Sequence, residues 1–148
     1  STALCPEFET RDDLVPVTHL SIADARNYAA WLSIETGRRY RLPTATEWRH
    51  AARAETDAIR WNFNCQVREG GKLVRGLSLQ PVAAGTDNNW GLRNYIGNAR
   101  EWVDAGDRLE ARGGAFTDSK ENCSVEARVE HDGEPDNVTG MRLVRIIE

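Results

Sequence analysis

Apolar residues recur with a helical period in residues 21–37, SIADARNYAAWLSIETG. Their spacing of three and four positions would place one set on a single face: Ala25, Tyr28, Ala29 and Leu32. Ser21 and Asp24 have the spacing of a capping box, and Gly37 supplies the residue type that commonly ends a helix. The pattern predicts one amphipathic helix.

The segment that follows, RLPTATEWRHAARA at residues 41–54, repeats this arrangement in a shorter form. Pro43 fixes the backbone ahead of the helix, and Thr44 and Glu47 form a second capping box. The apolar side consists of Trp48, Ala51 and Ala52. We expect a second, shorter helix.

The rest of the chain has no sustained helical period. Residues 1–20 are typical of an extended lead-in, whereas residues 55–111 show neither period and are rich in Gly, Asn, Asp and Trp. A stretch of this length without a period indicates functional or ion-stabilised loops. Short alternating or β-branched runs then predict antiparallel strands within residues 108–118, 123–130 and 139–148.

Composition indicates one folded domain over residues 1–148, because 40% hydrophobic and 28% charged residues are typical of globular proteins. No apolar run approaches the roughly 20 residues that cross a bilayer, so we expect no membrane insertion of this segment. The net charge of −4 excludes a nucleic-acid partner, which would need a basic face. The chain starts at Ser1 without a methionine or a signal-peptide pattern, and we expect it to belong to a longer polypeptide.

Three cysteines, Cys5, Cys65 and Cys123, form an odd set without a CxxC pair. The count signals neither a disulfide framework nor a zinc site. We interpret Cys123 as a small buried hydrophobic residue, because free cysteine is among the most buried residue types.

One stretch, NNWGLRNYIGNAREWV at residues 88–103, places two tryptophans around a tight turn. Tryptophans in such a loop are most simply core residues that pin it. The Asn94 side chain and the Glu101 carboxylate flank the turn at Gly97 and Asn98. Calcium takes about six to eight oxygen ligands of these kinds, but the spacing alone favours hydrogen bonds to loop amides over a metal site.

Five blocks of sequence stand in a characteristic order: residues 16–54, residues 81–103, RGGAF, CSVEAR and TGMRLVR. With the motifs RLPTATEW and GNAREW, they make residues 16–145 resemble the formylglycine-generating enzyme (sulfatase-modifying factor) family. The resemblance implies an α+β fold, that family's variant of the C-type lectin fold. We therefore expect two helices packed on short antiparallel strands, with long irregular loops.

The resemblance also implies a structural calcium ion in the loop between the two tryptophans. Its ligands would be the Asn94 side chain, the Gly97 and Ala99 carbonyl oxygens and the Glu101 carboxylate. A second family calcium site would begin near Asn64 and the Cys65 carbonyl, but its remaining ligands have no evident counterparts.

The chain departs from the family where the oxidising enzymes bind copper(I) with two cysteines after an RGG block. Asp118 stands at the first of these positions and Cys123 at the second. Copper(I) prefers soft thiolates, so a carboxylate opposite a single thiolate is a poor site. Family members usually carry several strands before this point, whereas only some fifteen residues precede Pro16, so that the sequence is either trimmed or a minimal version of the fold. Loss of those strands would remove part of the wall of the enzymes' substrate groove. We expect neither copper nor oxidase activity.

These departures favour a non-catalytic ligand-binding or sensing module. Six residues in the loop-rich segment 117–140 are candidates for contacting a ligand: Thr117, Asp118, Lys120, Glu121, His131 and Asp132. The alternative is a solvated loop without a ligand. The sequence does not determine whether the ligand is a small molecule, a glycan or a protein.

Family-like proteins without the cysteine pair are thought to serve as sensor domains of bacterial signalling proteins such as serine/threonine kinases, or as retroelement-diversified receptors. We prefer the sensor, because the segment contains Asn122 and Asn137 but no aromatic residue after Phe116. The resemblance favours a bacterial periplasmic or cell-surface location over the cytoplasm.

Other catalysis on the same fold has little support. His19, His50 and His131 are scattered, and no HExxH or Ser-His-Asp pattern occurs. The remaining alternative is that His131 and Asp132 activate the Cys123 thiol, because a neighbouring imidazolium lowers a thiol pKa.

Overall fold

The first predicted helix is α1 (Ile22–Thr36) in the computed structural model, which describes residues 15–56 and 63–147. Ser21 Oγ accepts a hydrogen bond from Asp24 N at 2.9 Å, and Ser21 N donates to Asp24 Oδ2 at 3.0 Å. Gly37 ends the helix with φ of 68°, in the left-handed region that suits glycine. The predicted capping box and C-cap are both confirmed.

The second predicted helix is α2 (Ala45–Arg53). Glu47 N donates to Thr44 Oγ1 at 3.1 Å, and Thr44 N donates to Glu47 Oε1 at 2.9 Å. Trp48 and Ala52 are buried on the face that meets the sheet. No helix within the described residues is long and apolar enough to cross a membrane.

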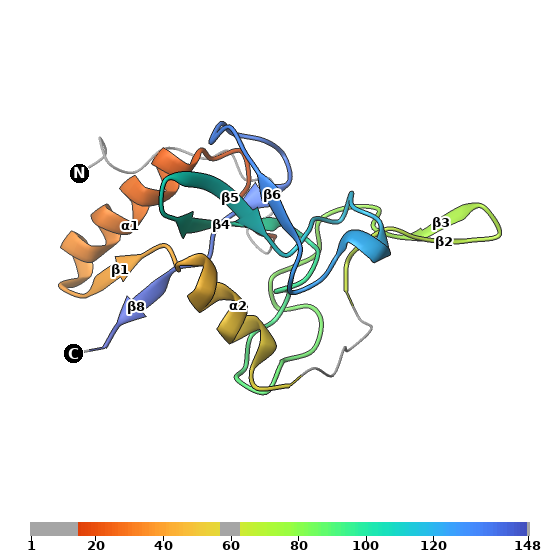
Figure 1. Ribbon diagram of the computed structural model, residues 1–148, viewed down its shortest axis with the longest axis horizontal. Coiled ribbons are helices and arrows are strands. Elements are labelled where there is room, and N and C mark those ends of the chain that lie inside the picture. The colour runs from red at the N-terminus through yellow and green to blue at the C-terminus, as the bar shows by residue number, and fades with distance from the viewer. Residues whose placement is uncertain (1–14, 57–62, 148) are drawn as a thin grey trace.

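The central sheet has four strands in the order β6-β5-β4-β7 (Figure 1). They are β4 (Arg100–Ala105), β5 (Arg108–Arg112), β6 (Arg128–Glu130) and β7 (Thr139–Gly140). β5 pairs antiparallel with both β4 and β6, whereas β7 pairs parallel with β4. The prediction of antiparallel strands is therefore wrong for β7, which returns to the sheet edge after a long loop.

Two further strand pairs lie outside this sheet. β1 (Arg39–Arg41) pairs antiparallel with β8 (Val144–Ile146), which places the end of the described chain beside the end of α1. β2 (Val67–Glu69) and β3 (Lys72–Arg75) form a hairpin that projects from the body (Figure 1). A 3-10 turn, η1 (Lys120–Asn122), lies near the base of that hairpin.

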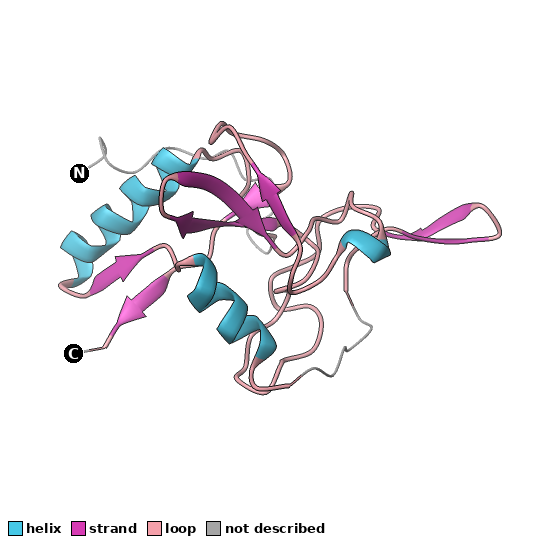
Figure 2. Ribbon diagram, in the orientation of Figure 1, coloured by secondary structure: helices cyan, strands magenta, loops and turns pink. Residues whose placement is uncertain are grey.

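The expectation that residues 55–111 are irregular is wrong in part, because they contain β2, β3 and β4, whereas β5 confirms the strand predicted within residues 108–118. β4 escaped sequence analysis because three consecutive residues, Glu101, Trp102 and Val103, are buried. A strand covered on both faces loses the alternation that marks a half-buried strand. The remaining connections are long loops, as predicted (Figure 2).

The core consists of two apolar clusters on either side of β4. One contains Leu20, Ile22, Ala25, Leu42, Trp102 and Ala111, and the other Trp48, Ala52, Cys65, Tyr95, Ile96 and Val103. Trp102 is fully buried and its Nε1 donates to Leu20 O at 3.1 Å. Trp90 is 42% exposed, so the core interpretation of the tryptophan loop holds for Trp102 and fails for Trp90. Trp61 lies outside the described residues.

Candidate functional site

The loop between Asn94 and β4 contains three residues whose backbone lies in the left-handed region. Asn94, Gly97 and Asn98 have φ values of 54°, 74° and 65°. The Asn94 amide Nδ2 donates to the carbonyl oxygens of Val82 and Ala84, each at 3.0 Å. Because Nδ2 is held in this way, Oδ1 is the Asn94 atom that remains for a cation.

Asn98 fixes the turn from within, with a side chain only 1% exposed. Its Oδ1 accepts hydrogen bonds from Asn64 Nδ2 at 2.9 Å and from Gln80 N at 2.8 Å. Asn64, expected at the start of a second calcium site, thus uses its amide to hold the first loop. No group of three or more His, Cys, Asp and Glu side chains suited to a metal occurs in residues 15–56 and 63–147. The second calcium site stays a prediction.

Glu101 is buried and already has two partners. Its Oε1 accepts from Trp48 Nε1 at 3.1 Å and from Arg142 Nε at 2.9 Å, while Arg142 Nη2 lies 3.3 Å from Oε2. Burial raises the pKa of the Glu101 carboxyl above its usual value, although Arg142 and Trp48 act to lower it. Burial thus outweighs the two contacts in its effect on this carboxyl.

A cavity of about 400 Å³ lies beside this loop, and Asn94, Ala99 and Glu101 line it. Gly97 does not line it. Three guanidinium-bearing residues share the same walls: Arg93, Arg100 and Arg142. Amide, carbonyl and carboxylate oxygens fit calcium in kind, and three of the four expected ligands face one space. A calcium ion here would have to share Glu101 with Arg142.

Cys123 forms a disulfide with Cys65, across a sequence separation of 58 residues and a Cα–Cα distance of 6.6 Å. The expectations that the cysteines signal no disulfide and that Cys123 is a free buried thiol are both wrong. An odd cysteine count hides a pair when the third residue does not take part, and Cys5 lies outside the described residues.

Backbone pairing brings the two cysteines together. Gln66 N donates to Asp118 O at 2.8 Å, and Lys120 N donates to Gln66 O at 3.0 Å. A Cβ atom on Gly97 would lie 2.5 Å from Cys65 Sγ, and one on Gly114 2.9 Å from Cys123 Sγ. Glycine at both positions therefore leaves room for the two sulfur atoms.

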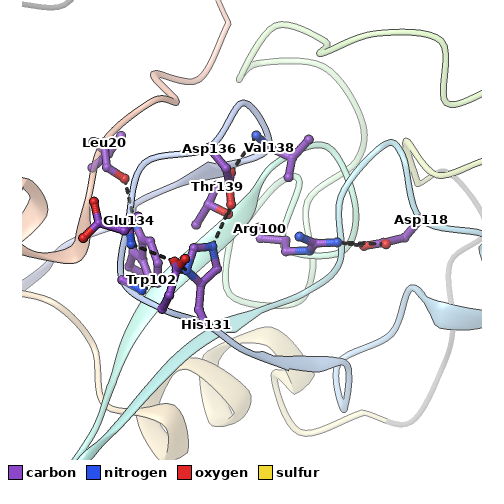
Figure 3. A network of polar contacts seen from close by, with 11 residues as sticks. Leu20, Arg100, Trp102, Asp118, His131, Glu134, Asp136, Val138 and Thr139 are labelled. Atoms are coloured by element: carbon purple, nitrogen blue, oxygen red, sulfur yellow. Dashed lines mark hydrogen bonds and ion pairs between the residues drawn. The ribbon is translucent and has the colours of Figure 1, made fainter.

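Asp118 stands where the resemblance places the other cysteine of the family's oxidising members. Its carboxylate oxygens lie 3.0 and 3.2 Å from Arg100 Nη2 (Figure 3). Asp118 Oδ2 also accepts a hydrogen bond from Ala115 N at 2.8 Å. Asp118 is thus committed to holding the loop after β5, next to a positive charge. Arg100 Nε is the buried side-chain nitrogen or oxygen without a hydrogen-bond partner among the described residues.

His131 belongs to a separate polar network (Figure 3). Its Nε2 lies 2.7 Å from Asp136 Oδ2, its Nδ1 accepts from Gly133 N at 3.0 Å, and its ring meets the Trp102 ring edge at a centroid distance of 4.4 Å. Asp136 also accepts from Thr139 Oγ1. The hypothesis that His131 activates a Cys123 thiol is wrong, because Cys123 is in a disulfide.

The six candidate ligand residues fall into two groups. Thr117, Asp118, Lys120 and Glu121 lie on the loop after β5, whereas His131 and Asp132 follow β6. A chain of contacts joins the groups through β4, since Arg100 binds Asp118 with its side chain and donates its backbone N to Val138 O at 2.7 Å. Val138 N in turn donates to Asp136 Oδ1 at 2.9 Å. The two half-buried members, Asp118 and His131, thus have their partners within the protein.

A second and larger cavity, about 770 Å³, was not foreseen from the sequence. Its walls come from the end of α2, the β2–β3 hairpin, the loop around Tyr95 and the segment from Lys120 to Glu126. Among the six candidate residues, Lys120 and Glu121 line it. Sequence reasoning missed it because its walls lie on separate segments that only the fold brings together.

One protein-family model and several known proteins are similar in sequence to this chain. The sulfatase-modifying factor enzyme 1-like domain model matches residues 4–147. A formylglycine-generating enzyme of Streptomyces coelicolor is 34% identical over 103 residues, covering 59% of this chain and 31% of that protein. An inactive C-alpha-formylglycine-generating enzyme 2 of Bos taurus is 35% identical over 102 residues, covering 60% and 32%. The chain therefore spans about a third of the length of these relatives.

Solved structures agree on the fold. PvdO from Pseudomonas aeruginosa superposes with a TM-score of 0.76 at 21% identity, covering 94% of this chain and 65% of that one. Treponema denticola variable protein 1 gives 0.74 at 18% identity, covering 93% and 74%. These likenesses confirm the predicted α+β fold of the formylglycine-generating enzyme type. Because the family model covers almost the whole sequence, this chain belongs to the family of the sulfatase-modifying factor enzyme 1-like domain.

Proposed function

We propose that this domain is a non-catalytic ligand-binding module. One observation carries the proposal: Cys123 is bonded to Cys65, and the partner position holds Asp118, ion-paired with Arg100. The copper(I) chemistry of the oxidising relatives needs two thiolates, and a thiolate rather than a disulfide sulfur is the metal ligand. The Arg100 guanidinium adds a positive charge at the place where a cation would bind.

The family relationship supports a binding role without oxidation. Relatives named inactive C-alpha-formylglycine-generating enzyme 2 share about a third of their aligned residues with this chain. Loops on a rigid core supply variable contact surfaces, and this core carries long loops around two cavities. The ligand would be a small molecule, a glycan or a protein.

We further propose that the module serves as a sensor domain of a larger bacterial signalling protein, such as a serine/threonine kinase. The disulfide supports a periplasmic or cell-surface location, because disulfides persist in oxidising compartments. The diversified-receptor alternative stays a prediction, since the likeness to the Treponema protein concerns the fold alone.

A structural calcium ion belongs to the same proposal. Asn94, Ala99 and Glu101 line one cavity, and Asn94 Nδ2 is held by carbonyl oxygens, which leaves Oδ1 for a cation. When bound, calcium would stabilise the loop before β4 without taking part in chemistry.

The test is conversion of a peptide cysteine to formylglycine in the presence of copper(I) and oxygen. The Streptomyces coelicolor relative serves as the positive control. We expect no conversion by this chain, and conversion above the copper-only background would overturn the proposal. The double variant Cys65→Ser/Asp118→Cys restores two thiols and should gain copper(I) binding, which the wild-type protein should lack.

A further inference from the structure

We infer that the 770 Å³ cavity is a binding site for a neutral, largely apolar organic molecule. This inference rests on the proposed binding function and names the class of ligand. The volume lies within the range of about 300–1,000 Å³ typical of small-molecule sites. The argument depends on three properties of the walls: their apolar floor, their satisfied polar groups and their balanced charges.

The floor of the cavity is apolar and well ordered by packing. Tyr95 and Ile96 are 7% and 5% exposed, and both line the cavity. Phe63 meets the Tyr95 ring edge at a centroid distance of 6.0 Å and an interplanar angle of 71°. The Cys65–Cys123 disulfide lies in the same wall and ties the segment before β2 to the segment after η1. An apolar ligand binds to such a surface because binding removes apolar area from water.

Asn88, the polar residue of the wall that is buried, offers little to a polar ligand. The Asn88 amide nitrogen donates to Ala51 O and Ala52 O, at 2.8 and 3.2 Å. Its Oδ1 accepts from Trp90 N and Leu92 N, at 2.9 and 3.0 Å. These four bonds use the capacity of the side chain. A ligand hydroxyl group would therefore find no free partner on Asn88.

The cavity wall carries equal numbers of positively and negatively charged side chains. Three cationic residues, Arg53, Arg75 and Lys120, line the cavity together with three acidic ones, Glu69, Glu121 and Glu126. Arg53 Nε lies 3.9 Å from Glu126 Oε1, and neither Arg75 nor Lys120 is without a partner in the protein. A charged ligand would therefore have to displace existing partners of these side chains. The equal numbers of positive and negative side chains would give it no net electrostatic attraction in return. A neutral ligand has no such penalty.

The test uses two fluorescent probes with the same aromatic skeleton. N-phenyl-1-naphthylamine is neutral, and 1-anilinonaphthalene-8-sulfonate adds a negative charge. We expect the neutral probe to bind the folded wild-type chain with one-to-one stoichiometry, at least tenfold more tightly than the sulfonate. Equal or tighter binding of the sulfonate would contradict the neutral class, and no binding of either probe would overturn the site.

A filling substitution locates the bound probe. Val74 lines the cavity from β3 and is 40% exposed, so Val74→Trp should occupy the space without disturbing the core. We expect at least a tenfold loss of affinity, whereas Ile34→Trp on the exposed face of α1 should leave it unchanged. Wild-type affinity in folded Val74→Trp would refute the assignment. Val125→Phe, in the opposite wall, provides the same test if Val74→Trp does not fold.

The two proposals fail separately. Formylglycine formation by the wild-type chain would end the non-catalytic proposal whatever the probes do. Absence of probe binding with no formylglycine formation would end the cavity assignment alone.

Discussion

Glu101 and Arg142 meet across 41 residues of sequence, with Arg142 Nε 2.9 Å from Glu101 Oε1, and Trp48 Nε1 donates to the same oxygen. This contact joins β4, α2 and the segment before β8 at one buried carboxylate. This buried carboxylate and its arginine thus lie beside the cavity proposed for calcium.

Arg142→Ala should destabilise the fold by about 3 kcal/mol, because it leaves Glu101 buried without its counter-charge. Urea denaturation measures the loss, with Arg145→Ala, an exposed arginine of β8, as the matched control. Burial already raises the pKa of Glu101, so stability from this group falls as pH rises through its folded pKa. The variant raises that pKa further and should lose more free energy of unfolding at pH 7.5 than at pH 4; an equal loss would contradict this account.

Calcium at a hundredfold excess over its Kd should add about 2.7 kcal/mol to the free energy of unfolding. Glu101→Gln should abolish this response, as measured by thermal melting with calcium and with a chelator. Glu110→Gln, which alters another buried carboxylate, is the control that should keep it. A full calcium response in Glu101→Gln would rule out Glu101 as a ligand.

Removal of the disulfide by Cys65→Ser/Cys123→Ser should cost about 2–5 kcal/mol, the range for a bridge that closes a loop of this length. In the folded wild-type protein, neither cysteine should react with iodoacetamide until a dithiol reductant is added. Peptide mapping by mass spectrometry distinguishes the two states. Labelling of Cys123 without reductant would show that the thiol is free.

The His131–Asp136 pair should make stability depend on acid pH. Burial would raise the pKa of Asp136, but hydrogen bonds from His131, Val138 N and Thr139 bring it below its usual value. Its contribution is therefore present above the unfolded pKa near 3.8 and lost as pH falls through the folded pKa. Asp136→Asn should cost about 1–3 kcal/mol at pH 7 and flatten the acid limb.

Asp132→Asn, at a neighbouring carboxylate whose side chain is 74% exposed, should change stability by less than about 0.5 kcal/mol. Chemical denaturation from pH 3 to pH 7 compares the two variants. Parallel acid limbs in wild type and Asp136→Asn would show that Asp136 does not titrate as described.

Local sequence signals predicted the helices well because capping is a short-range effect. Ser21 with Asp24, and Thr44 with Glu47, form the hydrogen bonds that their spacing indicates. β4 was missed because burial on both faces removes periodicity, and the resemblance to a known family supplied the fold instead. The disulfide and the large cavity depend on contacts between segments that are distant in the sequence. A single sequence does not show which distant segments are in contact.

The β2–β3 hairpin pairs with no other strand of the described chain and meets the body at its base, where Gln66 bridges Ser119. A two-stranded ribbon of this kind is marginally stable by itself. Its amide protons should therefore exchange with deuterium far sooner than those of β4, which lies within the central sheet. Val67 and Val74 of the hairpin line the large cavity. The wall that the hairpin forms should therefore be more mobile than the other walls of this cavity. The cavity volume of about 770 Å³ is then a lower bound on the size of the molecule that the cavity admits. A bulkier molecule would enter by displacement of the hairpin, without unfolding of the core.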